Sequence, residues 1–201
     1  MRKIMKIITI LLIVVLALEL WSLWQDRRAL QENLVRLHVV ANSDSQQDQQ
    51  IKLQVKDAIV AYLQPIMNQF TNKEQAIEYL RENLGSLQEL SNQVLDKLGV
   101  AHRAVVSLMP EKFDTRVYDT FTLPAGIYDA LRIQIGEATG KNWWCVVFPS
   151  LCLPATSTDF QYTAVSSGFS EPLINTISNN GGYRLRFFFL DCIGKIENLL
   201  F

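Results

Sequence analysis

The N-terminal segment has a basic lead followed by an apolar stretch. Three basic residues among the first six precede uncharged residues 7–18, a pattern typical of a signal peptide. The stretch is shorter than the roughly 20 apolar residues that span a bilayer as a helix, but no clear small-residue cleavage site follows it. Residues 1–25 are therefore predicted to be a signal peptide or an uncleaved membrane anchor, with a buried core helix as a third interpretation. Residues 25–31 are expected to form a polar connector.

Beyond the connector, the spacing of apolar residues predicts a strand and two helical regions. Residues 34–40 have apolar side chains on both faces, as expected of an interior strand. Apolar residues three and four positions apart predict a helix over residues 51–63, which ends near Pro65. A second helical region over residues 71–98 is interrupted by Gly85. Two amphipathic helices after a strand are expected to cover one face of a sheet.

The second half of the chain contains further strand patterns. Strands are predicted at residues 103–109 and 116–123. Residues 127–137 and 142–148 are predicted to pair as a hairpin, because Gly140 between them suits a tight turn.

The C-terminal third has a different composition. Residues 155–182 are rich in Ser, Thr, Asn and Gly without an apolar period, which predicts a polar, exposed loop or a poorly ordered insertion. Residues 184–201 have apolar side chains at helical spacing and predict a final helix. The predicted fold is α/β of the α+β type: a mostly antiparallel sheet of about five strands, two long helices packed on it and a C-terminal helix. Residues 33–201 are expected to form one extracytoplasmic domain.

Composition and charge limit the partners. The chain has 201 residues, a formal net charge of −1 and a sequence pI near 6.1. Proteins that bind nucleic acid normally carry a basic face, so no nucleic-acid partner is expected. Hydrophobic residues make up 49% of the chain, and the excess lies largely at the N-terminus. Membrane contact is therefore expected only through the N-terminal segment.

Export would change the chemistry of the three cysteines, because disulfides persist outside the cytosol. Cys145 and Cys152 are close enough in sequence to close a small loop if the chain turns at residues 148–150. A bridge of this length would stabilise the fold by about 2–3 kcal/mol in the loop-entropy model. Two free thiols are the alternative. Cys192 is expected to be a buried apolar thiol.

Few residues have the pattern of a catalytic or metal site. The two histidines, His38 and His102, and the cysteine spacing do not form a zinc motif, and no GxSxG nucleophile motif is present. No metal and no cofactor are therefore expected. Carboxylates on or near the predicted strands leave a secreted hydrolase as an alternative; they are Asp114, Asp119, Asp129 and Glu137.

Adjacent tryptophans favour binding over catalysis. Asn142, Trp143 and Trp144 begin a predicted strand, in which successive side chains point to opposite faces. One ring is therefore expected to point inward and the other outward. An exposed Trp suits the centre of a partner interface, and a nearby disulfide would reduce the entropy lost on docking. The alternative is a structural role, with one core ring and one partly covered ring.

Two longer segments resemble a known family. The first comprises residues 36–45, and the second comprises residues 128–137 and 142–149 through Cys152. In order and spacing they resemble the two signatures of the stage II sporulation protein R family. The similarity covers roughly residues 34–153.

The resemblance implies an exported signalling protein without known catalysis. Members of this family are made in the forespore of endospore-forming bacteria and exported into the space between its two membranes. There they activate a membrane-bound aspartic protease of the mother cell, which removes the pro-sequence of the sigma-E factor. No catalytic residues are implied. A membrane-tethered structural protein remains a second alternative. The residues expected to contact the extracytoplasmic face of the protease are Asn142, Trp143 and Trp144, together with Asn42, Ser43 and Asp44.

Overall fold

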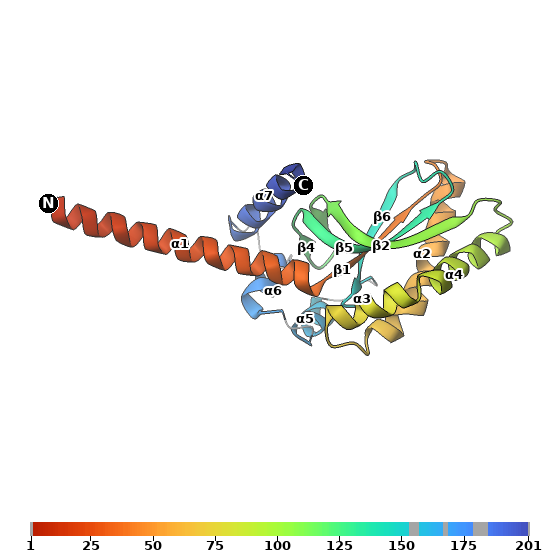
Figure 1. The fold of residues 1–201 in the computed structure, drawn as a ribbon, viewed down its shortest axis with the longest axis horizontal. Coiled ribbons are helices and arrows are strands. Elements are labelled where there is room, and N and C mark those ends of the chain that lie inside the picture. Colours follow the sequence, from red (N-terminus) through yellow and green to blue (C-terminus); the bar gives the residue numbers. More distant parts are fainter. Residues whose placement is uncertain (1, 153–156, 167–168, 179–184, 201) are drawn as a thin grey trace.

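The computed structural model describes residues 2–152, 157–166, 169–178 and 185–200. A long N-terminal helix projects from a body of mixed helices and strands (Figure 1). The helices are α1 (Arg2–Asn33), α2 (Gln46–Met67), α3 (Lys73–Glu82), α4 (Leu84–Lys97), α5 (Ser157–Ser166), α6 (Glu171–Ile177) and α7 (Leu185–Leu200). The strands are β1 (Val35–Val40), β2 (Ala104–Phe113), β3 (Arg116–Val117), β4 (Thr122–Leu123), β5 (Gly126–Ile135) and β6 (Asn142–Phe148). The fold is of the predicted α+β class.

The main sheet has the strand order β2-β5-β1-β6, and β3 and β4 form a separate two-stranded sheet. The β1–β5 pair is parallel, whereas β1–β6 and β2–β5 are antiparallel. The main sheet has four strands rather than about five. The reason is that residues 116–123, predicted as one strand, fold into a short hairpin. The chain turns where the amide of Tyr118 donates to the carbonyl of Phe121 at 2.8 Å.

β1 separates the two strands that were predicted to form a hairpin with each other. Both strands exist, but Val39 of β1 pairs with Ile133 of β5 on one side and with Trp143 of β6 on the other. The prediction that β5 and β6 pair directly is therefore wrong. All six residues of β1 are buried, and an interior position gives its main-chain groups partners on both edges. The prediction of an interior strand is confirmed.

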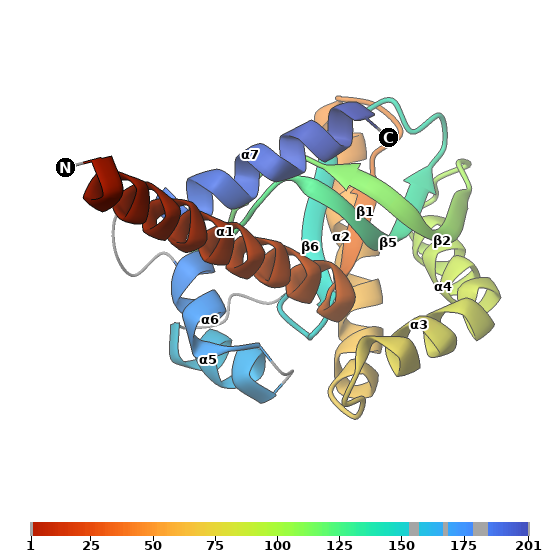
Figure 2. The same ribbon diagram turned by 60° about the vertical axis from the view of Figure 1, so that its left-hand side comes forward.

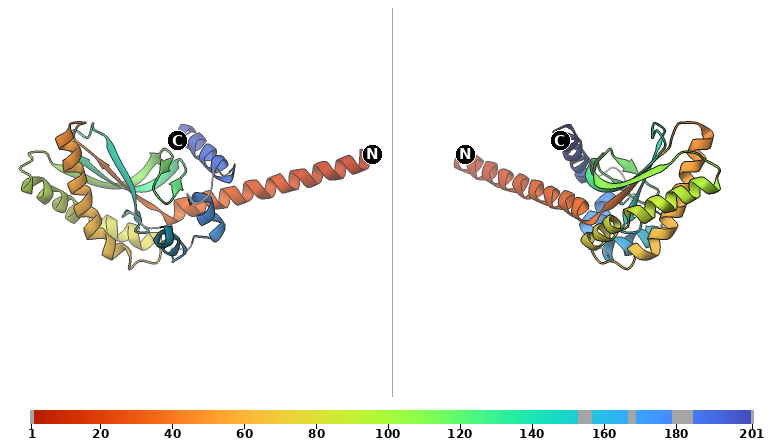
Figure 3. Two further views of the ribbon diagram at one scale, coloured as in Figure 1. Left: turned by 180° about the vertical axis from the view of Figure 1, so that it is seen from behind. Right: turned by 45° about the vertical axis from the view of Figure 1, so that its right-hand side comes forward.

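One face of the sheet packs against α2, α3 and α4 (Figure 3). Alternate residues of β1, namely Val35, Leu37 and Val39, join the apolar core on this side. The prediction that two helical regions cover one face is confirmed, with the second region split into α3 and α4. Helix α4 also covers the free edge of β2, because Asn92 accepts a hydrogen bond from the amide of Ala104 at 2.8 Å.

Two prolines lie inside regular elements rather than at their ends. Pro65 is within the last turn of α2, so the helix continues to Met67 and the predicted end was two residues too early. Pro110 is within β2, which runs on to Phe113. β2 is an edge strand, and the amides of Ala104 and Val106 point away from β5 toward α4. Pro110 lies an even number of residues from Ala104, so its nitrogen also points away from β5. The N–H group that proline lacks would therefore have made no hydrogen bond to β5.

The C-terminal third packs on the other face of the sheet. The prediction of an irregular loop at residues 155–182 is wrong for its described part, which contains α5 and α6. Ser170 caps α6 by accepting from the amide of Leu173. Leu173 and Ile177 are buried in a second apolar cluster with Leu30 of α1. The apolar period of so short a helix is hidden among polar residues, which is why composition alone indicated a loop.

Helix α1 continues through the predicted polar connector. Residues 25–31 are helical, so the connector prediction is wrong. Leu30 is fully buried, and Arg27 forms an ion pair with Glu197 of α7. Polar residues at this position therefore have partners in the body, which stabilises the continued helix. Only Leu34 separates α1 from β1.

Helix α7 confirms the predicted C-terminal helix, but its orientation differs from the apolar spacing that predicted it. Asp191 and Gly194 face the body and are buried, whereas Phe189, Ile196 and Leu200 are exposed. Cys192 is a half-buried free thiol. Asp191 accepts a hydrogen bond from the amide of Ala125 at 2.9 Å. Burial opposes ionisation of Asp191, but hydrogen bonds from Ala125, Lys195 and Thr115 outweigh it and lower its pKa.

Replacing Asp191 with Asn is expected to lower the free energy of unfolding by about 1 kcal/mol at pH 7, because charge-assisted hydrogen bonds become neutral ones. A lowered folded pKa means that the ionised carboxylate contributes stability above the ordinary aspartate pKa of about 4, and that this contribution is lost as the pH falls below it. The difference in the free energy of unfolding between the original chain and Asp191→Asn should therefore become smaller from pH 7 to pH 3. Urea unfolding of both full-length proteins in mild detergent measures this difference, and a difference that does not change with pH contradicts this role for Asp191.

Candidate functional site

Trp143 and Trp144 point to opposite faces of the sheet from the edge strand β6. Trp143 packs against the helix-covered core, with the Lys56 ammonium 4.8 Å from its ring centroid. Trp144 stacks on His38 with ring centroids 3.7 Å apart. The predicted alternation is confirmed, but both rings are half-buried, so neither is the fully outward ring that was expected. Asn142 before them is exposed.

A polar network fixes the His38 ring on which Trp144 stacks. Nδ1 of His38 lies 2.8 Å from Oε2 of Glu111, and Nε2 lies 2.9 Å from Oδ1 of Asn142. Nη1 of Arg132 lies 3.0 Å from the other carboxylate oxygen of Glu111. The imidazole is therefore fixed between two strands and presents a rigid plane to the Trp144 ring. Asn142 thus has an internal partner at this site.

Arg36 is fully buried next to this network. Its guanidinium lies 3.9 Å from the centroid of Phe113 and 5.2 Å from that of Tyr128, so the charge is placed over two aromatic rings. Nη2 donates to the hydroxyl of Tyr118 at 2.7 Å. Nε and Nη1 have no hydrogen-bond partner among the residues that the structure describes. Burial raises the pKa of Tyr128 to about 12, so this ring stays neutral.

A groove of about 530 Å³ lies beside β6. The Arg116 guanidinium lies 4.9 Å from the Trp144 centroid at this groove. The carbonyl of Val146 accepts from the amide of Leu151 at 3.2 Å and so points away from β1. By alternation, the main-chain groups of Asn142 and Trp144 point the same way, into the groove. The groove is lined by residues 116–121, 142–145, Leu151 and Cys152, and this set is called the β6 groove below.

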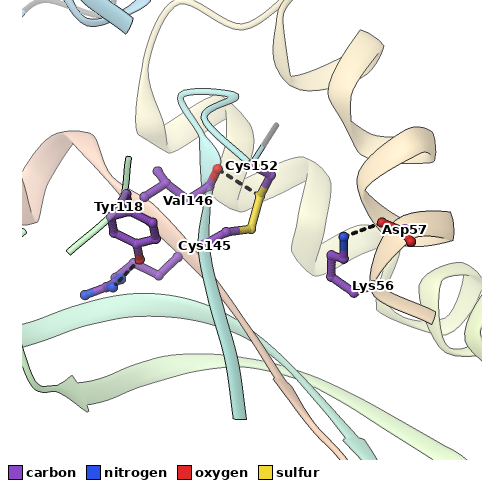
Figure 4. The surroundings of a disulfide bond; sticks show 7 residues. Lys56, Asp57, Tyr118, Cys145, Val146 and Cys152 are labelled. Carbon is purple, nitrogen blue, oxygen red and sulfur yellow. Dashed lines mark hydrogen bonds and ion pairs between the residues drawn. A yellow bond between two sulfur atoms is a disulfide. The ribbon is translucent and has the colours of Figure 1, made fainter. Parts of the chain in front are cut away.

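A disulfide joins Cys145 of β6 to Cys152, with the Cα atoms 5.2 Å apart. Figure 4 shows Tyr118 and Lys56 on opposite sides of the strand that carries this bond. Cys145 is buried in the core that packs under α2, and Cys152 packs against the same core. The bridge therefore ties one wall of the β6 groove to the apolar core.

Asn42, Ser43 and Asp44 lie at the same end of the sheet as Asn142. Asp44 accepts from the amide of Lys141 at 2.7 Å, directly before β6. Asn42 and Ser43 both donate to Asp48 in the first turn of α2, and these hydrogen bonds lower the pKa of its carboxyl. The structure thus brings the two predicted contact groups together. It also gives Asn42, Ser43 and Asp44 internal partners.

The four carboxylates of the hydrolase alternative lie in separate places. Asp129 forms an ion pair with Lys73 of α3 at 2.6 Å. Glu137 is exposed after β5, and Asp114 is exposed after β2. Asp119 lines the β6 groove. Within the described residues, no three His, Cys, Asp or Glu side chains are placed to hold a metal ion.

Sequence reasoning missed the polar face of the sheet. The residues of this face that were not predicted as site residues are Arg36, His38, Glu111, Arg116 and Arg132. One signal was available. Arg36 and His38 alternate with apolar residues on a strand that was predicted to be interior, and buried charged residues normally have specific partners. Those partners are on strands far away in the sequence, so they were not visible in the local pattern.

The fold and the site define an α+β domain, attached to an exposed apolar helix, whose disulfide-bearing edge strand faces an open groove. The chain belongs to the stage II sporulation protein R family, whose model matches residues 31–158. That range contains β1 to β6 and the β6 groove, but not α6 or α7. The family name is that of a sporulation protein and implies no catalytic activity.

A stage II sporulation protein R from Bacillus subtilis (strain 168) is 35% identical to the chain over 121 residues. The aligned part is 60% of this chain and 54% of the relative, so the chain spans about half the length of that curated protein. No solved structure matches the chain.

A methyl group at Gly140 is expected to break the contact between the turn and the loop of residues 42–44. An added Cβ would lie 2.2 Å from the main-chain oxygen of Ser43. Gly140→Ala should therefore lower the free energy of unfolding by about 1–3 kcal/mol. Gly85→Ala is the matched control, because nothing lies within 4 Å of its Cβ and the site is helical. It should raise stability by about 0.5–1 kcal/mol, and equal effects of the two changes in urea unfolding contradict the contact.

Removing the disulfide is expected to destabilise the domain. The double change Cys145→Ala and Cys152→Ala should lower the free energy of unfolding by about 2–3 kcal/mol in non-reducing buffer. Cys192→Ala is the control and should change stability much less, because this thiol is free and half-buried. Mass spectrometry of non-reduced peptides tests the bridge directly, and two free thiols at these positions count against it.

Proposed function

We propose that this chain is an exported signalling protein that activates the membrane-bound aspartic protease which processes pro-sigma-E during sporulation. The observation that carries the proposal is the β6 groove, which lies wholly within the part matched by the family model. The chain acts by binding the extracytoplasmic face of that protease in the space between the forespore and mother-cell membranes.

Helix α1 and the disulfide support an extracytoplasmic location. An 18-residue window of α1 has a mean hydropathy of 2.5 and is 0% buried in the body, as expected of a signal sequence or a membrane anchor. The Cys145–Cys152 bond is of a kind that persists outside the cytosol. Residues 1–25 are thus assigned to export or anchoring, and residues 33–201 to the signalling domain.

The chemistry of the β6 groove suits an extended protein segment. An edge strand offers main-chain donors and acceptors to a partner strand, and β6 offers those of Asn142 and Trp144. Tryptophan and arginine dominate binding energy in protein interfaces, and the ring of Trp144 lies under the guanidinium of Arg116. We assign the contact with the protease to Asn142, Trp143 and Trp144, with Asn42, Ser43 and Asp44 at the end of the same surface.

Activation by binding requires a difference in affinity. A ligand shifts a conformational equilibrium only if it binds the active arrangement more tightly than the inactive one. The β6 groove is held rigid by the disulfide and by the His38 network, so little conformational entropy is lost on docking. A preformed groove of this kind favours the active state of the protease, because that is the state that presents a fitting segment to the groove.

The two alternatives have distinct consequences. A secreted hydrolase would act on its substrate without the protease and would depend on one of the four carboxylates, which lie apart in the structure. A membrane-tethered structural protein would leave pro-sigma-E processing unchanged when it is deleted. Neither alternative is favoured by an arrangement of the described residues.

Reversing the charge at Arg116 is expected to abolish activation while leaving the fold intact. Arg116→Glu removes the guanidinium from the Trp144 ring without creating a core cavity. Loss of an interface residue of this kind typically costs at least about 2 kcal/mol, or roughly thirtyfold in affinity. The measurement is pro-sigma-E cleavage in cells that produce the protease, its substrate and the exported chain. Trp143→Ala with Trp144→Ala should abolish cleavage as well.

Val105→Glu is the matched control. Val105 is 56% exposed on β2, at the opposite edge of the sheet, so a glutamate is introduced away from the β6 groove. Secretion and circular dichroism of each variant separate folding from binding. Normal cleavage with a folded, exported Arg116→Glu or double tryptophan variant would show that the protease binds elsewhere.

A further inference from the structure

Helix α7 is amphipathic in the reverse sense to an ordinary surface helix. Besides the fully buried Leu190, its inward side makes polar contacts: Asp191 accepts from the amide of Ala125 at 2.9 Å, and Asn198 donates to the carbonyl of Phe113 at 2.9 Å. Glu197, also on this side, accepts a hydrogen bond from Gln31 of α1 at 3.1 Å. An ordinary surface helix has its apolar stripe against the core and its polar residues in water.

The outward side of α7 is apolar. Phe189, Ile196, Leu199 and Leu200 are 44%, 56%, 85% and 73% exposed. At 100° per residue, these four positions lie within an arc of about 100° on the side opposite Gly194. Monomeric soluble proteins rarely expose a contiguous apolar surface of this kind unless it contacts something.

The body fixes this orientation. An added Cβ at Gly194 would lie 1.7 Å from the carbonyl oxygen of Ala125, so the helix backbone packs directly on the chain before β5. The ion pair between Glu197 and Arg27 fixes the next turn against α1. Because these contacts need Gly194 and Glu197 inward, α7 cannot turn its apolar side toward the core without losing them.

The apolar side of α7 continues onto α1. Figures 1 and 2 show α7 beside the part of α1 that enters the body. In a shared groove there, Trp24 of α1 lies with Ile193, Ile196 and Leu200 of α7, and the rest of the lining is polar: Arg27, Arg28, Gln31, Glu32 and Glu197. Trp21 and Trp24 are exposed at the point where the bare apolar part of α1 begins, and tryptophan is enriched where helices leave the bilayer core.

We propose that α7 is an interfacial helix that lies on the lipid bilayer into which α1 inserts. Its apolar side enters the headgroup boundary, as other amphipathic helices do, while its polar side holds the domain. Lipid is the occupant because the apolar surface is continuous with that of α1, so one apolar medium covers both. This extends membrane contact beyond the N-terminal segment that the sequence indicated. It does not depend on the proposed activation of a protease.

The test measures the depth of α7 in the bilayer. The full chain is prepared with Cys192→Ser and Leu199→Cys, so that with the disulfide intact the only thiol carries a fluorescent label. It is reconstituted into vesicles of phosphatidylglycerol and phosphatidylethanolamine that contain nitroxide-labelled lipids. The label at position 199 should be quenched at least roughly threefold more strongly than the same label at Val105→Cys, because position 105 lies on β2, away from α7.

A further pair of variants shows whether the apolar side itself is responsible. Ile196→Glu with Leu200→Glu should bring quenching at position 199 down to the control level, because both side chains are exposed and the fold does not need them. Val117→Glu, on the exposed hairpin, should leave it unchanged. Equal quenching at positions 199 and 105 would overturn the proposal. The proposal would also be overturned if the label were shielded from water to a degree that rises with the protein-to-lipid ratio and does not depend on nitroxide lipids. A second copy would then be the occupant.

Discussion

The position of β1 between β5 and β6 is the constraint on which the rest of the structure depends. Residues of β1 alternate between two environments: Leu37 faces the helices and the apolar core, whereas Arg36 and His38 face the opposite side. Burying a guanidinium is costly without compensation, and Phe113, Tyr128 and Tyr118 supply it from neighbouring elements. The requirements of one strand thereby place the aromatic residues of β2, β5 and the short hairpin on one face of the sheet.

The candidate site follows from the same arrangement. Because β1 takes the interior position, β6 becomes the edge strand, and the stack of Trp144 on His38 forms at the boundary between core and groove. Trp143 packs on the other side beneath Lys56. The disulfide then joins the middle of β6 to Cys152, which packs against the same apolar core. The site is thus an extension of the core packing rather than a separate loop, and its rigidity is a property of the sheet.

Local patterns predicted the elements well and their neighbours poorly. The strand 34–40, the helices covering one face, the break near Gly85 and the final helix all follow from short-range periodicity. The pairing of β5 with β1 could not be predicted, because Gly140 favours a tight hairpin and the competing strand lies about a hundred residues away in sequence. The polar face was missed for the same reason, since the partners of Arg36 and His38 come from β2 and later segments. In α5 and α6, a few well-spaced apolar residues outweigh a polar composition.

The single residue between α1 and β1 has a mechanical consequence. Leu34 is buried, and both the helix before it and the strand after it are regular. No slack chain therefore separates the apolar helix from the central strand, and a tilt of one must reorient the other. When α1 is held in a bilayer, this short connection therefore fixes both the distance of the edge strand from the lipid surface and its orientation relative to that surface.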